Sequence, residues 1–233
     1  MFGYRARVGY TAPLAAVETF PYEFYRMVPE GVTLMVATNP AGEQDREATN
    51  AVSEAVAREM AQVGASIIVI GGASPAFGLE RLETQARELR QEFGIPVTNT
   101  REAQLHALRE LDARRVGIVM FGAATGRAGW DRFADDGFEV VGVAGAGYTQ
   151  ADFGRCPVDA PAQVARRLAA EHPEADTIFI PAPHWPAASN VEMLEQELGV
   201  NVVTSAQAIV WEALRLCRIA DPVEGYGRLL REH

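Results

Sequence analysis

The sequence predicts an α/β protein built from two similar halves, each with a parallel β-sheet, related by a pseudo-twofold axis with a site in the cleft between them. Short β-branched runs alternate with amphipathic stretches along the chain, as in βα units around a parallel sheet. The second half also repeats the order of motifs in the first. With 233 residues, 48% of them hydrophobic, the chain can bury one large core or two smaller ones. We expect the first half at residues 1–112, with its final helix free to pack on the other half, and the second at 113–233.

The predicted strands are short apolar runs, most of them rich in Val and Ile. They cover residues 7–12, 32–38, 66–70, 96–99, 115–121, 139–143, 177–181 and 201–204. Between them lie helices whose apolar residues recur every three or four positions. One such helix places on a single face Ala48, Val52, Val56, Met60 and Val63, and the next does the same with Leu79, Leu82, Ala86 and Leu89. Each sheet therefore has helices that can cover it.

The internal repeat identifies two equivalent strand ends. The run Ile-Ile-Val-Ile-Gly-Gly at 67–72 matches Thr-Ile-Phe-Ile-Pro-Ala at 177–182, an offset of 110 residues (182 − 72). Each run is followed by a proline-containing turn and an amphipathic helix. Parallel sheets bind ligands beyond the carboxyl ends of their strands. We therefore expect Gly72 and Ala182 to face each other across one site.

Composition and charge exclude several classes of protein. The formal net charge is −10 and the chain contains no lysine, which argues against nucleic acid as a partner. No apolar run approaches the roughly 20 residues that a membrane span needs. The first residues lack the apolar core of a signal peptide, so we expect a cytoplasmic location. The two cysteines, Cys156 and Cys217, form no metal-ligand or disulfide pattern, and no glycine-rich segment fits a nucleotide motif. We expect no metal and no cofactor.

Several segments together carry a family resemblance over nearly the whole chain. They are Val-Gly-Tyr-Thr-Ala-Pro at 8–13, Phe-Tyr-Arg-Met-Val-Pro-Glu-Gly-Val at 24–32, Gly-Gly-Ala-Ser at 71–74, Arg-Val-Gly at 115–117, Leu-Gly-Val at 198–200, Val-Val-Thr-Ser at 202–205 and Trp-Glu-Ala-Leu-Arg-Leu at 211–216. The chain resembles the aspartate/glutamate racemase superfamily, in its maleate cis-trans isomerase and arylmalonate decarboxylase branch. The resemblance implies proton transfer at a carbon next to a carboxylate, without a cofactor.

The sequence departs from this family at the residues that normally do the chemistry. The resemblance implies two cysteines at the repeated strand ends, or glycine at the first and cysteine at the second in the decarboxylase. Here the two positions hold Gly72 and Ala182. Cysteine, with a reference pKa of about 8.5, supplies a usable nucleophile or base near neutral pH, and alanine does not. Gly122 stands where the decarboxylase has a pocket tyrosine, and Ala73 and Ser74 where the family has threonine and serine.

Two residues are the catalytic candidates. His184 lies two residues beyond Ala182, and an imidazole with a reference pKa of about 6.5 can act as acid or base; alternatively, it is a loop histidine packed beside Trp185. Ser74 lies before a helix, where a hydroxyl and backbone amides can hold a carboxylate, or where it simply caps the helix. A relocated thiol at Cys156 is a weaker option. The positions expected to contact substrate are Pro13, Gly72, Ala73, Ser74, Gly122, Ala182, Pro183, His184 and Ser205.

These observations predict a cofactor-independent decarboxylase or cis-trans isomerase acting on a small organic acid through a group other than cysteine. Two alternatives remain at this point. The chain is a catalytically inactive protein that binds small carboxylates, or Ala182 is an engineered replacement for a cysteine. Neither a membrane nor nucleic acid is expected as a partner, and assembly into a homo-oligomer stays open.

Overall fold

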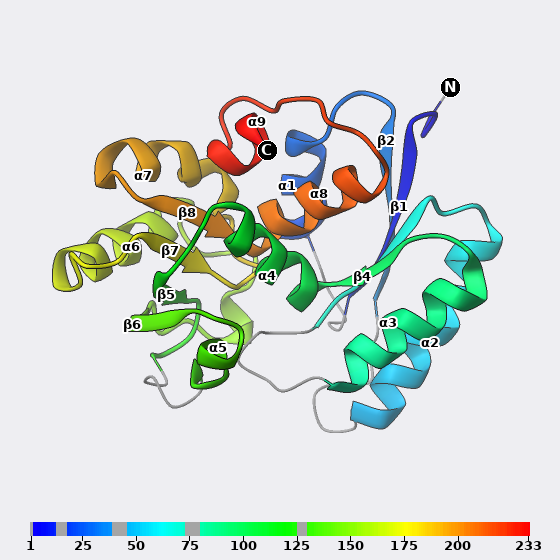
Figure 1. The fold of residues 1–233 in the computed structure, drawn as a ribbon, viewed down its shortest axis with the longest axis horizontal. Helices are drawn as coiled ribbons and strands as arrows, with labels where there is room; N and C mark the ends of the chain where they lie inside the picture. The colour runs from blue at the N-terminus through cyan, green and yellow to red at the C-terminus, as the bar shows by residue number, and fades with distance from the viewer. Residues whose placement is uncertain (1, 13–17, 39–45, 73–79, 125–129) are drawn as a thin grey trace.

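Two parallel sheets of four strands lie at the centres of the two halves (Figure 1). The computed structural model describes residues 2–12, 18–38, 46–72, 80–124 and 130–233. The first sheet contains β1 (Ala6–Ala12), β2 (Val32–Thr38), β3 (Ile67–Ile70) and β4 (Val97–Asn99). The second contains β5 (Arg115–Met120), β6 (Glu139–Gly145), β7 (Thr177–Ile180) and β8 (Asn201–Thr204). All eight predicted strands are present.

The strand orders show the repeat directly. The first sheet runs β2-β1-β3-β4 and the second runs β6-β5-β7-β8, so each strand of the second sheet takes the place of the strand four earlier. All neighbouring strands are parallel. The predicted fold class of two similar parallel-sheet halves is therefore confirmed. In this order β3 and β7 are equivalent interior strands, flanked on both sides.

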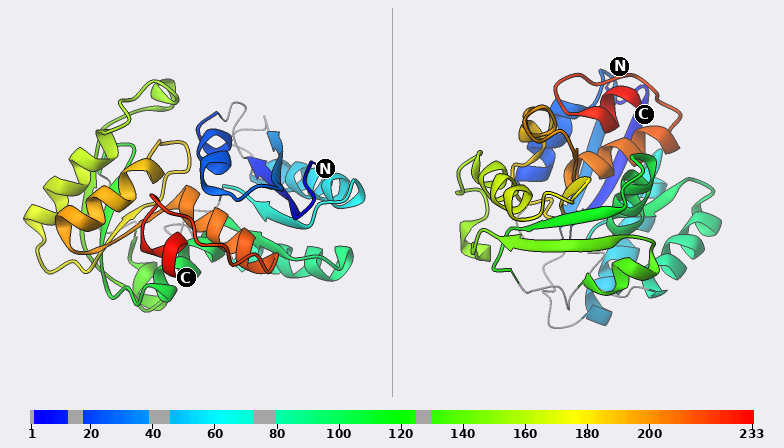
Figure 2. Two further views of the ribbon diagram at one scale, coloured as in Figure 1. Left: turned by 90° about the horizontal axis from the view of Figure 1, so that it is seen from above. Right: turned by 60° about the vertical axis from the view of Figure 1, so that its left-hand side comes forward.

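Helices cover both faces of each sheet, as Figures 1 and 2 show. In chain order they are α1 (Thr19–Met27), α2 (Arg46–Gln62), α3 (Glu80–Phe93), α4 (Thr100–Glu110), α5 (Arg132–Asp135), α6 (Ala160–Glu171), α7 (Val191–Leu198), α8 (Ser205–Leu216) and α9 (Arg228–Glu232), with short 3-10 turns η2 (Gln150–Asp152) and η3 (Ala188–Asn190). The final helices α4 and α8 pack on each other, and α4 contacts β8 while α8 contacts β3. One hydrophobic core includes side chains from both sheets and from these two helices.

The predicted buried face of α2 is partly wrong. Met60 is buried as predicted, but Val52 and Val63 are 38% and 54% exposed, and Ala57, which the prediction left out, is fully buried. A side chain at Gly9 of β1 would meet the sulfur of Met60, so the missing side chain there lets the helix rest on the strand. The small residue at position 57 allows the same close approach. For α3, burial of Ala86 and Leu89 is confirmed; Leu79 and the side chains of Ala48 and Leu82 lie outside the described parts.

Capping residues at the ends of β4 and β8 fix where the two final helices begin. Asn99 accepts a hydrogen bond from the backbone amide of Glu102 at 2.9 Å. Thr204 accepts one from the amide of Gln207 at 3.2 Å, and the Gln207 side chain accepts one from the amide of Thr204, also at 3.2 Å. This second arrangement is a capping box. The helix therefore starts directly at the strand end, which places Ser205 in its first turn.

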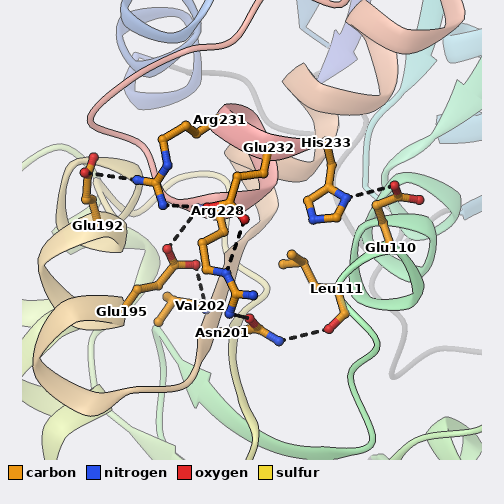
Figure 3. A network of polar contacts seen from close by, with 10 residues as sticks. All are labelled: Glu110, Leu111, Glu192, Glu195, Asn201, Val202, Arg228, Arg231, Glu232 and His233. Carbon is orange, nitrogen blue, oxygen red and sulfur yellow. Dashed lines mark hydrogen bonds and ion pairs between the residues drawn. The ribbon is translucent and has the colours of Figure 1, made fainter.

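A polar network at the end of the chain joins α7, β8 and α9 to the first half (Figure 3). Glu195 accepts hydrogen bonds from the backbone amides of Arg228 at 2.9 Å and Val202 at 3.3 Å. Asn201 donates to the carbonyl of Leu111, just after α4, at 2.9 Å. His233 contacts Glu110 at 3.1 Å. The network fastens the outer end of α4 to the second sheet.

The described residues contain neither a candidate membrane span nor a candidate metal site. None of their helices has the length and apolarity of a membrane span. Nor do the described side chains include a group of three or more His, Cys, Asp and Glu that could hold a metal ion.

Candidate functional site

The turn after β7 carries three of the predicted contact residues on a well-packed support. The Trp185 amide donates to the carbonyl of Ala182 at 3.3 Å and closes the turn. The Trp185 ring is fully buried, 5.6 Å from Phe121 and 6.2 Å from Tyr148 between centroids. Ala182, Pro183 and His184 are only partly buried. Burial of Trp185 therefore anchors the turn, with the partly buried His184 ring directly before it.

His184 is a neutral imidazole at neutral pH. Burial lowers its pKa to about 4, because a charged ring would lose hydration there. Its ring lies 5.2 Å from Phe153, centroid to centroid. Across the described part of the chain no hydrogen bond to the ring is found. Packing against Phe153 fits a loop histidine with a structural role. The absence of a hydrogen bond to the ring nitrogens among the described residues fits a role as acid or base, because a substrate could bond to them.

Gly122 lies beside this turn, because it follows β5, the strand next to β7. A side chain at Gly122 would come within 3.6 Å of the carbonyl of Tyr148, an ordinary contact distance. The Tyr148 ring itself packs 5.4 Å from Phe121. Sequence reasoning missed Tyr148, whose backbone carbonyl approaches Gly122 and whose ring packs on the neighbouring Phe121. The preceding glycine-rich segment was the available signal, because such segments form close turns.

The strand end of the first half is shaped by its backbone. The Gly71 amide donates to the carbonyl of Thr11 at 2.8 Å, and a side chain at Gly71 would collide with that oxygen. Gly72 is exposed and has a φ of +91°, a conformation that side chains disfavour. Pro13, Ala73 and Ser74 lie outside the described residues, so the roles assigned to them stay predictions.

Ser205 is fully buried in the contact between the two final helices. Its hydroxyl accepts a hydrogen bond from the side chain of Gln104 on α4 at 2.7 Å. The structure therefore gives Ser205 a partner within the protein, and its predicted contact with a ligand is untested. Cys156 packs at the edge of the core that contains Trp185. Burial raises the pKa of its thiol, which reduces the fraction of reactive thiolate.

A carboxyl group missed by sequence reasoning connects the halves at this site. Glu23 on α1 accepts a hydrogen bond at 2.7 Å from the backbone amide of Ala188, six residues beyond Ala182 (188 − 182). Glu23 lies on the same buried face of α1 as the core residues Phe20 and Phe24. A glutamate at a position where the helical pattern expects an apolar residue was the signal in the sequence.

A family model, a protein of similar sequence and a solved structure all point to arylmalonate decarboxylase as a relative of this chain. The family model described as arylmalonate decarboxylase matches residues 12–230. Arylmalonate decarboxylase of Bordetella bronchiseptica is 28% identical over 194 residues, which cover 80% of this chain and 81% of that protein. A crystal structure of arylmalonate decarboxylase matches with a TM-score of 0.80 and 26% identity, covering 96% of this chain and 98% of the other.

A more distant structure shares the fold. It is a maleate cis-trans isomerase of Nocardia farcinica, a cysteine-to-serine variant with a covalently bound succinylcysteine intermediate. Its TM-score is 0.80 at 22% identity, with 98% of this chain and 99% of the other covered.

Proposed function

Because the chain belongs to the arylmalonate decarboxylase family, we propose that it is a cofactor-independent decarboxylase of a small malonate-type acid, with His184 as the proton donor. The predicted family is confirmed by this membership, and the predicted class of lyase or isomerase agrees with the named relatives. One observation carries the residue assignment: His184 lies on the same turn as Ala182 and is the nearest ionisable side chain along the chain to that strand end.

Decarboxylation fits this chain better than isomerisation. The isomerase named above carries a covalent succinylcysteine, and such an adduct needs a thiol at the site. Gly72 and Ala182 supply none, and the raised pKa of Cys156 disfavours its thiolate. Decarboxylation needs no bond between enzyme and substrate. The bond to the departing carboxylate breaks, its electron pair moves into the remaining carboxyl group as an enediolate, and carbon then accepts one proton.

The charge of His184 is expected to change when substrate binds. The free ring is neutral, and a neutral imidazole is a poor proton donor to carbon. A bound dicarboxylate places negative charge beside the ring and favours the imidazolium form. The ring then takes one proton from solvent on binding and gives it to carbon after carbon dioxide leaves. Dicarboxylate binding should therefore be accompanied by proton uptake, which calorimetry in buffers of different ionisation enthalpy measures.

Turnover of a panel of aryl- and alkylmalonates, followed by NMR, tests the proposal. His184→Ala should lower the rate by about 10²–10⁴-fold, the usual contribution of a general acid. The control is His172→Ala, a histidine that pairs with Glu174 outside the site. Ser74→Ala tests the second candidate. Full activity in both His184→Ala and Ser74→Ala would refute these assignments. Tight calorimetric binding without any product would instead identify a carboxylate-binding protein.

Ala182→Cys separates this proposal from a chain whose original cysteine has been replaced. If His184 is the native donor, the added thiol should change the rate less than about tenfold, and the double variant with His184→Ala should stay slow. A gain of roughly a hundredfold or more that persists without His184 would assign the proton to the thiol. His184 would then have no part in the reaction.

A further inference from the structure

One carboxyl group connects the first half of the molecule to the site turn of the second. The Glu23 side chain on α1 is only 3% exposed, and its Oε1 accepts the hydrogen bond from the Ala188 amide. Ala188 begins η3, three residues after the turn that carries Ala182 and His184. Figure 2 shows α1 next to the connection between β7 and α7 in both views. Glu23 is thus placed to control where the segment 182–190 lies.

The bonded residue is also the point where this segment passes between two cores. Trp185 and Ala187 belong to the core of the second sheet, whereas Ala188 belongs to the core that contains Phe20 and Phe24 of α1. Farther along, the Asn190 side chain donates to the carbonyl of Val158 at 2.8 Å. The segment is therefore held by its own half on either side of Ala188, and Glu23 holds it to the other half.

The Glu23 carboxyl is poorly suited to carry a charge here. Its Oε2 is buried and has no hydrogen-bond partner among the described residues. Burial raises the pKa of Glu23 to about 7, against the opposing effect of the amides of Ala188 and Ala187. No charged side chain contributes to that shift. The titratable groups on the elements that pack with it are Glu18, Tyr22, Tyr25 and Arg26 around α1, Tyr10 on β1, Tyr226 beside Arg26, His184 before η3, and Glu212 and Arg215 on α8.

We propose that Glu23 is a positioning residue: as a neutral carboxylic acid it holds the segment 182–190 against α1, and its ionisation favours release of Ala188 and, with it, displacement of His184. An ionised carboxylate with one bare oxygen in this position lacks the hydration it needs. Moving the segment away lets water reach that oxygen. The consequence for catalysis depends on the proposed function, whereas the movement of the segment does not.

Amide hydrogen exchange of residues 182–190 between pH 5 and pH 8, corrected for the intrinsic exchange rate, tests the proposal without any ligand. A pKa of about 7 in the closed state, in place of the ordinary 4.5, allows the opening equilibrium to grow by up to roughly seventyfold between pH 5 and pH 8. Glu23→Gln keeps the shape and the acceptor but cannot ionise, so its opening should stay low at every pH. Glu23→Ala removes the acceptor and should open at every pH. The control is Glu30→Gln, an exposed residue just beyond α1, which should behave as the wild type.

Two outcomes would overturn the proposal. One is an opening equilibrium in the wild type that does not change with pH. The other is a pH dependence that Glu23→Gln retains in full. If Glu23→Ala fails to fold by circular dichroism, the comparison of wild type with Glu23→Gln still decides. The two proposals can fail separately. If malonates are not turned over but hydrogen exchange depends on Glu23, the proposed function alone is refuted. If malonates are turned over but hydrogen exchange does not depend on Glu23, the positioning role alone is refuted.

Discussion

The strand ends after β3 and β7 occupy the same place in two sheets of the same topology, yet they are built differently. After β3, the described residues Gly71 and Gly72 are fixed by the close approach of Thr11 and by a positive φ. After β7, a proline-rich turn is anchored by the buried Trp185 and presents His184. The two halves thus have equivalent strand ends. Among the described residues, only the strand end after β7 has an ionisable side chain next to it, that of His184.

The largest expected effect comes from removing the anchor of the second strand end. Trp185→Ala should lower the free energy of unfolding by about 3–5 kcal/mol, because a fully buried ring leaves a cavity among aromatic neighbours. Urea denaturation measures the change. Val158→Ala, at an exposed side chain, is the control and should cost less than about 0.5 kcal/mol. A loss below about 1 kcal/mol for Trp185→Ala would mean that the ring does not support the turn.

The next effect concerns the pH dependence of stability. The folded pKa of Glu23, about 7, lies above its ordinary value of 4.5, so the folded state binds the proton more tightly. Stability from this group is fully present below pH 4.5 and is lost as the pH rises through 7. The loss is at most about 3 kcal/mol for a shift of this size. Urea denaturation at pH 5 and pH 8 should show it in the wild type, with a smaller change in Glu23→Gln. An identical change in both would show that Glu23 does not titrate in this way.

Exchanging the residues at the two strand ends has the smallest expected effect. Gly72→Ala should cost roughly 1–2 kcal/mol because its φ of +91° disfavours a side chain. Ala182→Gly should cost less than about 1 kcal/mol, through added freedom in the unfolded chain. Thermal unfolding followed by circular dichroism compares the two. Equal costs would contradict a backbone reason for glycine at position 72, and would leave ligand space as its explanation.

Much of the fold could be predicted from the sequence because its signals are local. Val and Ile runs identify the strands, and the motif offset between 67–72 and 177–182 identifies the duplication. Apolar spacing predicted only part of the buried face of α2, because the contact with the sheet also depends on Gly9 of a distant strand. Hydrophobic spacing reports which residues are apolar. It does not report how closely a helix can approach.

The repeat predicts equivalent turns after β3 and β7, and the contacts that hold these turns could not be predicted. The structure confirms that β3 and β7 are equivalent strands, whereas the roles assigned to residues 182–184 stay predictions. Ser205 was expected to meet a ligand, but its hydroxyl pairs with Gln104, a residue 101 positions earlier. Glu23 and Ala188 are 165 positions apart. Contacts between the two halves join residues far apart in the sequence and follow no regular spacing. They therefore could not be predicted from one sequence.

The shared core between the halves has a consequence for how a ligand enters. Tyr10 and Val69 of the first sheet lie in the same buried cluster as Phe179 and Val203 of the second. Swinging the halves apart as rigid bodies would bring this apolar surface into water, at a cost of about 25 cal/mol for each Å² exposed. Hinge opening of the kind seen in loosely joined domains is therefore disfavoured. Movement confined to the turn after β7 exposes none of this shared core, so we expect the two sheets to stay fixed as a common frame when a ligand binds.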